Sequence, residues 1–559
     1  MQSVYIQIAR KRLSIVIGLI FCVLTAGMAQ DLKKEIYVVS SYKPTLADAE
    51  KISSMPSITD TMKLETQTDY TLLPSRIKTD FSPRTIKPAK MVGTPLDKLY
   101  KSYLRLGLGN YVTPLAEYSI HNLRSKEYTV GGYIFHKSSH TKMELENGAN
   151  VPAGYGRNEL SVYGKKFYKA INITADVGMN THRVRHYGYN VDNFPDSIPE
   201  PEVDDIKQSF FQLYGIVGVH SAKADSGALD YALAIRGDYY RDHFKNKEPH
   251  FNIAGNISYP IKTFRLGLNS AYDYYNFNEG TRKELLLMIH PFAMKRKPEW
   301  EVKLGARFMM EKQGDATRGF LFPDAGIRFQ IIDKALALKI GVTGYLENNN
   351  YYSVTTENPY LVPGTDVKNT LHRFIASGGI EGHLSRKMSY RVDVNFDIME
   401  DALFYFNDTN SLLENQFDIL YDDADLITYH GEFSWMPLSY LTVFLKGNYY
   451  SYKMAAESHP WQRPSADLTF AIVYNFKEKV FVELDYLNIG KRYARNYADP
   501  NNPYQLKSVH DLNLKLEYKY SNILSGFVHI YNLLSQEYYL WNQYPSQRLN
   551  LLAGVTYKF

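Results

Sequence analysis

The last eleven residues of the chain, 549–559, alternate between two kinds of side chain. Successive side chains of a β-strand point to opposite faces of the sheet, so this pattern predicts a strand with one apolar face. A tilted strand of about ten residues that ends in aromatic side chains has the length and chemistry of a membrane-crossing β-strand. The face predicted to contact lipid comprises Leu549, Leu551, Ala553, Val555, Tyr557 and Phe559, and the opposite face comprises Asn550, Leu552, Gly554, Thr556 and Lys558.

The same alternation recurs in earlier segments. Residues 511–520 place Leu and Tyr on one face and Asp, Asn, Lys and Glu on the other. Residues 335–346 repeat the pattern, with Leu346 on the predicted apolar face, and residues 465–476 do so with Asp467 on the polar face. A water-soluble β-sandwich also alternates, but a second sheet must cover its apolar face. Because charged residues occupy one face of long consecutive hairpins, the pattern favours a barrel with a wet lumen over a secreted sandwich.

From about residue 101 onward, the connections between the alternating segments are short and long in alternation. Outer-membrane barrels have this asymmetry, with short periplasmic turns and longer external loops. We predict ten short turns, near residues 122–125, 168–169, 222–227, 260–262, 295–298, 331–333, 384–387, 436–438, 477–478 and 520–522. We predict eleven connections on the other side, near residues 136–156, 181–206, 347–368, 400–423, 453–463, 491–505 and 534–546, with shorter ones near 110, 245, 278 and 313.

The predicted fold class follows from these connections. It is all-β, a transmembrane antiparallel up-and-down β-barrel of about 22 strands over residues 99–559, with a short irregular N-terminal segment. An even number of strands places both ends of the barrel on the periplasmic side.

The first 29 residues have the order of a secretory signal peptide. Three cations at residues 10–12 precede an apolar run over 13–26, and small residues end at Ala29, after which we predict cleavage. A retained membrane anchor is the alternative, but the apolar run is short and polar sequence follows it. The only cysteine, Cys22, lies in this leader, so neither disulfides nor thiolate metal sites are expected in the exported chain.

Residues 30–98 differ from both neighbours because they are rich in proline and show little alternation. We predict a mostly irregular periplasmic or lumenal segment there. The formal net charge of the whole chain is only +5, which gives no case for a nucleic-acid partner. Export, the lack of an apolar run long enough for a helical span, and pervasive alternation leave two classes, a secreted all-β protein and an outer-membrane barrel. The barrel implies outer-membrane lipid as a partner.

Charged clusters in the predicted connections are the candidate binding residues. Acidic side chains in residues 192–205 could bind calcium, but they lack the EF-hand spacing, so a solvated loop is the favoured interpretation. Asp422, Asp423 and Asp425 are interpreted in the same way, with steering of cationic solutes as the alternative. Basic residues in the short turns are interpreted as anchors for lipid phosphates, with a periplasmic protein partner as the alternative. These are Lys165, Lys166, Lys169, Lys262, Lys295, Arg296, Lys297, Lys334, Arg386, Lys387, Lys477 and Lys479.

Catalytic motifs are absent from the sequence. There is no G-x-S-x-G, no H-E-x-x-H and no phosphate-binding loop, and the 15 histidines are scattered without a metal-ligand spacing. We therefore predict no enzymatic activity, no cofactor and no metal site. The 47 tyrosines are expected in aromatic girdles or in the lumen.

The end of the chain resembles the tail of TonB-dependent receptors. In that family the penultimate strand ends in an Asn-Leu plus aromatic pattern, matched here by residues 531–539, and a Tyr-Pro-x-x-Arg element precedes the last strand, matched by residues 544–548. The final aromatic residues, Tyr557 and Phe559, resemble the family's barrel-assembly signal. The match is specific over roughly the last thirty residues and architectural over about 101–530. The resemblance implies a 22-strand barrel in the outer membrane of a Gram-negative bacterium.

The N-terminal side departs from that family, whose members carry a folded plug domain much longer than residues 30–98. Within this region Glu35, Ile36, Tyr37, Val38 and Val39 resemble a TonB box, which a TonB-type energy-coupling protein pairs with as an added strand. The alternative to a TonB box is that these five residues form a strand that lies against the barrel wall or against another envelope protein. Because barrels of this size are plugged rather than open, we expect the segment to fold back as a small plug, helped by inward loops.

Two functions are compatible with this sequence. The leading hypothesis is a TonB-dependent-receptor-like barrel that takes part in solute uptake or passage across the outer membrane. The alternative is a non-transporting barrel subunit of an outer-membrane assembly, secretion or nutrient-capture complex, which the short N-terminal segment and the basic turns would allow.

Overall fold

The computed structural model describes residues 99–145, 148–189, 204–222, 227–278, 282–411 and 413–559. The predicted signal peptide, the N-terminal segment and the TonB-box-like strand lie outside the described residues, as does most of the acidic loop 192–205. Their boundaries and roles therefore stay predictions. Among the described residues, no helix is long and apolar enough to cross a membrane.

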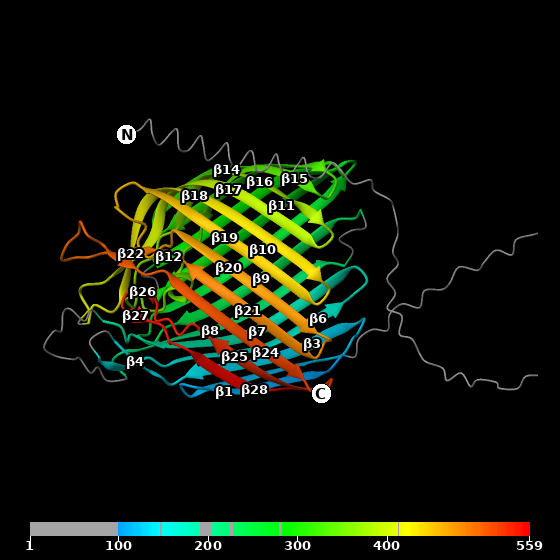
Figure 1. The fold of residues 1–559 in the computed structure, drawn as a ribbon. Helices are drawn as coiled ribbons and strands as arrows, with labels where there is room; N and C mark the ends of the chain where they lie inside the picture. Colours follow the sequence, from blue (N-terminus) through cyan, green and yellow to red (C-terminus); the bar gives the residue numbers. More distant parts are fainter. Residues whose placement is uncertain (1–98, 146–147, 190–203, 223–226, 279–281, 412) are drawn as a thin grey trace, which may run out of the picture. The chain divides into compact units, whose positions relative to one another are not determined.

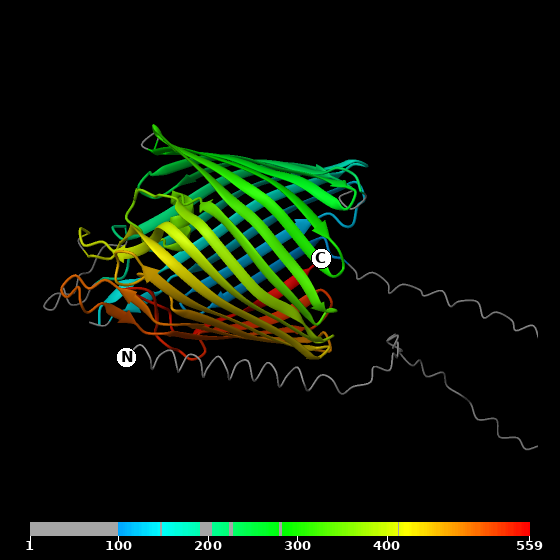
Figure 2. The same ribbon diagram turned by 90° about the horizontal axis from the view of Figure 1, so that it is seen from above.

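One sheet of 22 antiparallel strands forms the wall of a closed barrel (Figures 1 and 2). Each strand pairs with the next wall strand in chain order, and β1 also pairs with β28, which closes the ring. The predicted fold class and strand number are therefore confirmed. The wall strands are β1 (Ser102–Gly109), β2 (Thr113–His121), β3 (Tyr128–Ser139), β6 (Tyr155–Phe167), β7 (Ile171–Arg185), β8 (Lys207–Ser221), β9 (Asp230–Arg241), β10 (Lys247–Ile261), β11 (Phe264–Phe277), β12 (Arg282–Arg296), β13 (Trp300–Gln313), β14 (Ala316–Ile332), β15 (Leu336–Glu347), β16 (Thr370–Ser385), β17 (Met388–Asn407), β18 (Phe417–Leu438), β19 (Leu441–Met454), β20 (Ala466–Phe476), β21 (Val480–Ile489), β24 (Val509–Lys519), β25 (Leu524–Tyr531) and β28 (Asn550–Lys558).

The connections divide between the two ends of the barrel as predicted. All ten short turns lie at the end where Ser102 and Phe559 meet, and the eleven other connections lie at the opposite end. We call these the short-turn end and the long-loop end. The connection predicted over 400–423 is shorter than expected, because β17 continues to Asn407 and β18 begins at Phe417. The wall is uneven in consequence: β17 and β18 have 20 and 22 residues, whereas β1 and β28 have 8 and 9.

The outer face of the wall is apolar. On β28 the side chain of Val555 is 51% exposed, whereas its neighbour Thr556, which points inward, is 1% exposed. The alternation predicted for residues 549–559 is therefore observed. Leu108 and Leu321 are among the most exposed apolar side chains of the wall, at 72% and 74%. Such a continuous apolar surface is stable only where lipid covers it.

Lysines at the short-turn end lie over aromatic rings. The Nζ atom of Lys295 is 4.8 Å from the centre of the Phe264 ring. Lys477 lies over Phe476 in the same way, at 5.2 Å. A cation held over an aromatic girdle is placed at the level of lipid headgroups, which supports the interpretation of these turns as anchors.

The face predicted for Leu346 is wrong. This side chain is only 4% exposed and packs with Tyr275, Leu286, Phe322 and Leu371 instead of facing lipid. The pairing of β15 with β16 shifts register between Thr343 and Tyr345. A register shift breaks strict alternation, so residues beyond it no longer follow the face assignment made from the earlier part of the strand.

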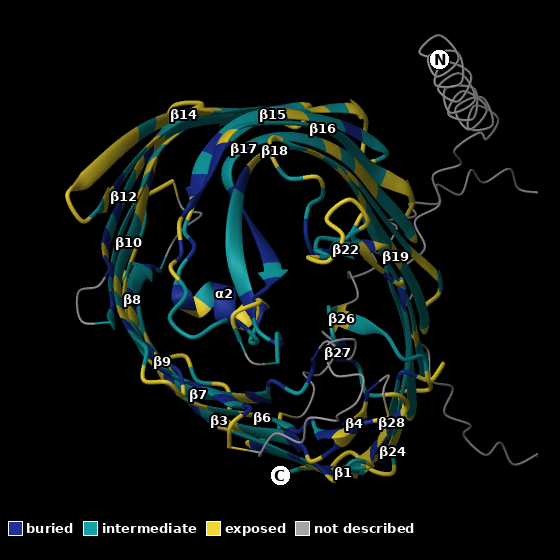
Figure 3. Ribbon diagram, turned by 90° about the vertical axis from the view of Figure 1, so that its left-hand side faces the viewer, coloured by how far each residue is buried: buried dark blue, intermediate teal, exposed yellow. Residues whose placement is uncertain are grey.

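Short elements from the long loops lie inside the ring of wall strands when the barrel is viewed from the long-loop end (Figure 3). One helix and several two-stranded pieces can be followed there. They are α2 (Tyr351–Glu357), β4 (Lys142–Glu144) with β5 (Asn150–Pro152), β22 (Arg492–Ala494) with β23 (Tyr504–Leu506), and β26 (Tyr539–Trp541) with β27 (Tyr544–Pro545).

Candidate functional site: the loop lid and its pocket

Segments far apart in the chain pack together at the long-loop end and form a second core within the barrel mouth. We call this assembly the lid; it consists of residues 348–369, 532–549 and the loop-side ends of β17 and β18. Its buried members are Val354, Leu361, Val367, Leu403, Tyr405, Phe417 and Tyr544, with Tyr187, Tyr360, Ile419, Tyr421 and Trp541 packed against them. Burial of large side chains contributes about 1.5–3 kcal/mol each, so the lid has its own source of stability.

Aromatic rings form the centre of the lid. The rings of Tyr360 and Tyr544 stack with centroids 3.7 Å apart, and Tyr187 meets Tyr544 edge-on at 5.0 Å. Trp541 packs edge-on against Tyr405 at 5.1 Å. Stacked and edge-on pairs add about 0.5–1.5 kcal/mol each beyond the burial of their area. Ring contacts thus join residues 532–549 to the other two segments, and an isolated backbone bridge between Leu361 and Phe417 joins residues 348–369 to β18.

The phenol groups in this core are satisfied by backbone oxygens. The hydroxyl of Tyr187 donates to the carbonyl oxygen of Pro545 at 2.7 Å, and the hydroxyl of Tyr544 donates to the carbonyl oxygen of Asn415. Burial raises the pKa of both tyrosines. Both therefore remain neutral donors at physiological pH, and each hydrogen bond links residues 532–549 to a neighbouring loop.

Buried carboxylates of the wall hold α2. Glu248, on β10, accepts hydrogen bonds from the backbone N–H groups of Tyr351 at 2.9 Å and Tyr352 at 3.1 Å, which are the first two residues of the helix. Asp242 accepts a hydrogen bond from the hydroxyl of Tyr351 at 2.7 Å. Free N–H groups at the start of a helix favour an acceptor with negative charge. These contacts hold the beginning of the loop 348–369 against the wall.

A second set of carboxylates holds the exit of the same loop. Asn369 donates through Nδ2 to Glu284 and, at 2.8 Å, to Glu311. Glu284 is 1% exposed and forms an ion pair with Arg282, while Glu311 pairs with Arg318 at 2.6 Å. A buried carboxylate is stable only when paired and hydrogen-bonded. The loop 348–369 is therefore attached to the wall at both of its ends.

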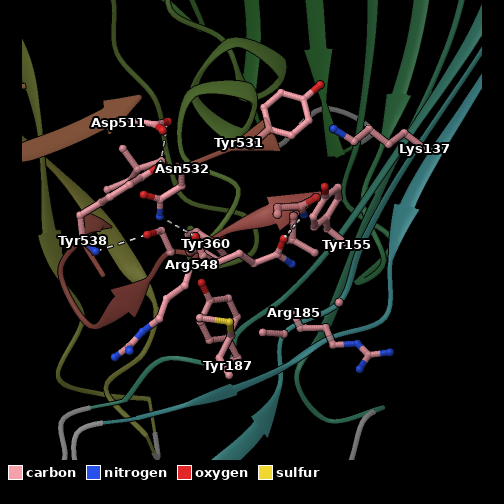
Figure 4. A pocket seen from close by; sticks show the side chains of 18 of the residues that line it. Lys137, Tyr155, Arg185, Tyr187, Tyr360, Asp511, Tyr531, Asn532, Tyr538 and Arg548 are labelled. Carbon is pink, nitrogen blue, oxygen red and sulfur yellow. Dashed lines mark hydrogen bonds between the residues drawn. The ribbon is translucent and has the colours of Figure 1, made fainter. Parts of the chain in front are cut away.

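A pocket of about 410 Å³ lies where the lid meets β3, β6, β7, β24 and β25 (Figure 4). The Nζ atom of Lys137 is 4.8 Å from the centre of the Tyr531 ring. Asp511 accepts a hydrogen bond from the hydroxyl of Tyr538 at 3.1 Å through Oδ2, whereas its buried Oδ1 has no hydrogen-bond partner among the described residues. The lining also includes Tyr155, Arg185, Tyr187, Tyr360, Asn532, Gln547 and Arg548.

The lining gives the pocket a definite chemistry. The lining residues include several tyrosines, Lys137, Asp511 and two arginines, of which Arg548 is paired with Glu537. This set can stack on a flat or ring-shaped solute and can pair with anionic or hydroxyl groups on it. It contains no arrangement of nucleophile, base and oxyanion donors of the kind that covalent catalysis needs. Within the part of the chain that the structure describes, no group of His, Cys, Asp and Glu could hold a metal ion.

The tail motif noticed in the sequence explains how the pocket is built. Asn532 has a positive φ of 49° and donates through Nδ2 to the carbonyl oxygens of Gln536 at 2.7 Å and Gln547 at 3.1 Å, which bends the loop after β25 back onto itself. In the Tyr-Pro-x-x-Arg element, Tyr544 enters the lid core and Arg548 pairs with Glu537 at 2.7 Å. The motif therefore shapes the lid and the pocket.

The acidic cluster near residue 422 pairs with its own surroundings. Asp422 accepts hydrogen bonds from the backbone N–H groups of Ala456 and Glu457, and Asp425 lies 3.8 Å from Lys453. The structure does not bring this cluster into the pocket. Tyr557 and Phe559 stack at 5.5 Å on the outer face beside the β1–β28 closure, which is compatible with the assembly signal, although that role stays a prediction.

Burial of His186 predicts that closure of the lid region depends on pH. The imidazole is 3% exposed, faces the Tyr360 ring at 6.1 Å, and has a pKa lowered by burial to about 4. When the loop opens, the pKa returns towards about 6.5, so the open state binds a proton that the closed state excludes. Closure is therefore expected to weaken as the pH falls from about 6.5 to about 4, by up to about 3 kcal/mol.

Hydrogen exchange of residues 186–189 at pH 7 and pH 5 measures this effect, and the His186→Phe variant, which cannot take up a proton, should lose it. An equal pH response in the variant would contradict the assignment to His186.

Comparison with known proteins identifies the fold. Neither protein-family models nor curated proteins match the sequence. Among solved structures, the chain is similar to the FrpB iron transporter of Neisseria meningitidis (F3-3 variant), with 10% identity and a TM-score of 0.62 over 83% of this chain and 82% of that one. It is also similar to the ferric-catecholate import receptor Fiu of E. coli K12, with 8% identity, a TM-score of 0.63, and coverage of 83% and 82%.

The siderophore receptor PirA of Acinetobacter baumannii gives the same result, with 10% identity, a TM-score of 0.63, and coverage of 83% of this chain and 81% of that chain. At these identities the likeness concerns the fold. The chain shares the fold of these structures, and its closed barrel of 22 strands is the one that the resemblance of its tail led us to expect.

Proposed function

We propose that this protein is an outer-membrane receptor of a Gram-negative bacterium that takes part in the uptake of a solute. The observation that carries the proposal is a pocket of about 410 Å³ whose walls belong partly to the barrel and partly to the lid. This volume lies in the range of about 300–1,000 Å³ that is typical of small-molecule sites. Since long loops of outer-membrane barrels face the outside, the pocket and lid would meet solutes arriving from there.

The proposed cycle uses the lid as a gate. A solute with ring or anionic groups binds against Tyr531, Lys137 and Asp511, and movement of the lid then gives it access to the lumen. Residues 348–369 and 532–549 are joined to each other and to the ends of β17 and β18 by ring contacts and a few hydrogen bonds, so these two loops can move without breaking the wall. Passage to the periplasm would need an energy-coupling partner, for which residues 35–39 are the candidate strand.

Native purification tests the proposal against its alternative. The full-length protein would be extracted gently from membranes and examined by mass spectrometry for both small molecules and proteins. Uptake predicts a bound small molecule at near-stoichiometric amounts. A stoichiometric protein partner with no bound solute would instead favour a fixed subunit of an outer-membrane complex.

The Lys137→Met variant is expected to lose most of this bound solute. Methionine keeps the length and the contact with Tyr531 but removes the ammonium group, and loss of one charge-assisted contact costs about 1.4 kcal/mol, or about tenfold in affinity. The measurement is the molar ratio of copurified small molecule to protein. Lys142→Met is the matched control, because Lys142 lies outside the lining of this pocket. Equal retention by both variants would argue against solute binding at Lys137.

A further inference from the structure

Four cations form a row on the outer face of the wall at the long-loop end. They are Arg241 on β9, Lys247 on β10, Lys283 on β12 and Lys312 on β13, and we call them the outer basic row. Each lies within two residues of the end of its strand, so all four stand at a similar height on the wall. Arg241, Lys283 and Lys312 are exposed and Lys247 is half-buried.

The outward direction of the row follows from the neighbours of its members. Glu248, Glu284 and Glu311 are sequence neighbours of Lys247, Lys283 and Lys312, and all three carboxylates point inward to the lid loop 348–369. Asp242, next to Arg241, also points inward, to Tyr351. Since successive side chains alternate between the faces of a strand, the four cations point away from the lumen.

Three members of the row, Arg241, Lys283 and Lys312, have no compensating charge among the described residues. Arg241 and Lys247 are direct cross-strand partners, an arrangement of like charges that destabilises an antiparallel pair. No ion pair within the described residues involves Arg241, Lys283 or Lys312. The outward-facing positions at this end of β9 to β14 carry no Asp or Glu. Because acidic side chains do not neutralise these three cations, the row favours binding of an anion from outside the protein.

The surface next to the row is apolar. On the side towards the middle of the wall, the outward face continues with exposed Phe251, Phe308 and Leu321. The guanidinium of Arg241 lies over the outward ring of Phe211 at 5.1 Å. A soluble anion would make no favourable contact with this apolar surface. A lipid would place its acyl chains on the surface and its headgroup at the height of the cations.

We propose that the outer basic row binds the phosphate groups of lipids in the outer leaflet of the membrane. This inference rests on the outer-membrane location given under the proposed function, and it does not depend on solute uptake. The same strand ends hold the lid with carboxylates on the inner face and the lipid with cations on the outer face. The partner proposed is a phosphorylated lipid, because it offers an anionic head that can carry more than one charge together with apolar tails.

Native mass spectrometry of the full-length protein in detergent tests the proposal, with diphosphoryl lipid A, monophosphoryl lipid A and phosphatidylcholine as probes. Retention should follow the number of phosphates. A cation near a headgroup contributes about fivefold in affinity, so the Lys283→Gln/Lys312→Gln variant should bind diphosphoryl lipid A roughly 25-fold more weakly. The control is Lys142→Gln/Lys507→Gln, which removes the same charge from two exposed residues of the long loops outside the row and should bind as the unaltered protein does.

Three results would overturn the proposal: equal weakening in both variants, no preference for diphosphoryl lipid A over phosphatidylcholine, or complete competition by inorganic phosphate, which would indicate a site for free anions. Heat-modifiable migration in gels shows that each variant forms its barrel. A protein that keeps its solute but fails the lipid test overturns this inference alone, because the pocket and the row share no residue.

Discussion

The Glu284→Ala variant is expected to release the lid loop 348–369 from the barrel wall. Glu284 accepts a hydrogen bond from Asn369 and neutralises the buried Arg282. Removing one partner of a buried ion pair costs about 3–5 kcal/mol, because the remaining charge is left without compensation. The cost is relieved when the loop leaves and water reaches Arg282. The variant should therefore show faster hydrogen exchange over residues 348–369 and a larger conductance in planar bilayers.

The matched control for this experiment is Glu432→Ala. Glu432 is also a wall carboxylate, but its side chain is 30% exposed and its ion pair is with His430 at 3.3 Å, outside the lid. Its exchange pattern over residues 348–369 should equal that of the unaltered protein. If Glu284→Ala left both exchange and conductance unchanged while the barrel formed normally, the carboxylate anchor would not hold the lid.

The Tyr544→Ala variant should destabilise the lid by about 3–5 kcal/mol, which is the cost of removing a large buried aromatic side chain. Tyr544 is 3% exposed, stacks on Tyr360 and meets Tyr187. Without the Tyr544 ring, residues 532–549 should separate from residues 348–369. Conductance should then rise, and the pocket should lose the part of its lining that belongs to the lid. Channel recordings and hydrogen exchange over residues 538–548 measure both effects.

A graded series separates the ring from its hydroxyl. Tyr544→Phe keeps the stacking and loses only the hydrogen bond to the carbonyl oxygen of Asn415, so it should cost about 1–2 kcal/mol. Tyr520→Ala is the control, because Tyr520 is 75% exposed in a turn at the other end of the barrel. A Tyr544→Ala protein that behaves like Tyr520→Ala would show that ring stacking does not keep the lid in place.

The wall of the barrel could be predicted from the sequence because its cause is local. Lipid on one side and water on the other impose a period of two on every strand, and this period can be seen in segments such as residues 511–520. The alternation of short and long connections then fixes the strand number and places every short turn. Leu346 shows where this reasoning fails, since a register shift is set by the pairing of β15 with β16 and leaves no sign in the sequence of β15 alone.

The lid could not be predicted in the same way. Its core joins Tyr187, Tyr360 and Tyr544, which lie in three loops distant in sequence, and no period relates them. Among 47 tyrosines nothing in the composition distinguishes these three. The one available signal was the tail motif, which pointed to residues 544–548 without indicating that Tyr544 is buried in the mouth. The burial of the inward carboxylates could not be predicted either, because in the sequence Glu284 is indistinguishable from an ordinary charged residue at a strand end.

The uneven height of the wall has a mechanical consequence. The ring closes between β1 and β28, which have 8 and 9 residues, whereas β17 and β18 on another part of the wall have 20 and 22. Resistance to peeling grows with the number of ladder hydrogen bonds that must break together, so the junction of the first and last strands is among the weakest lines in the cylinder, as is the pairing of β24 with β25. Tension applied to the C-terminus would unzip the molecule from this junction, while the tall strands on the far part of the wall would yield last.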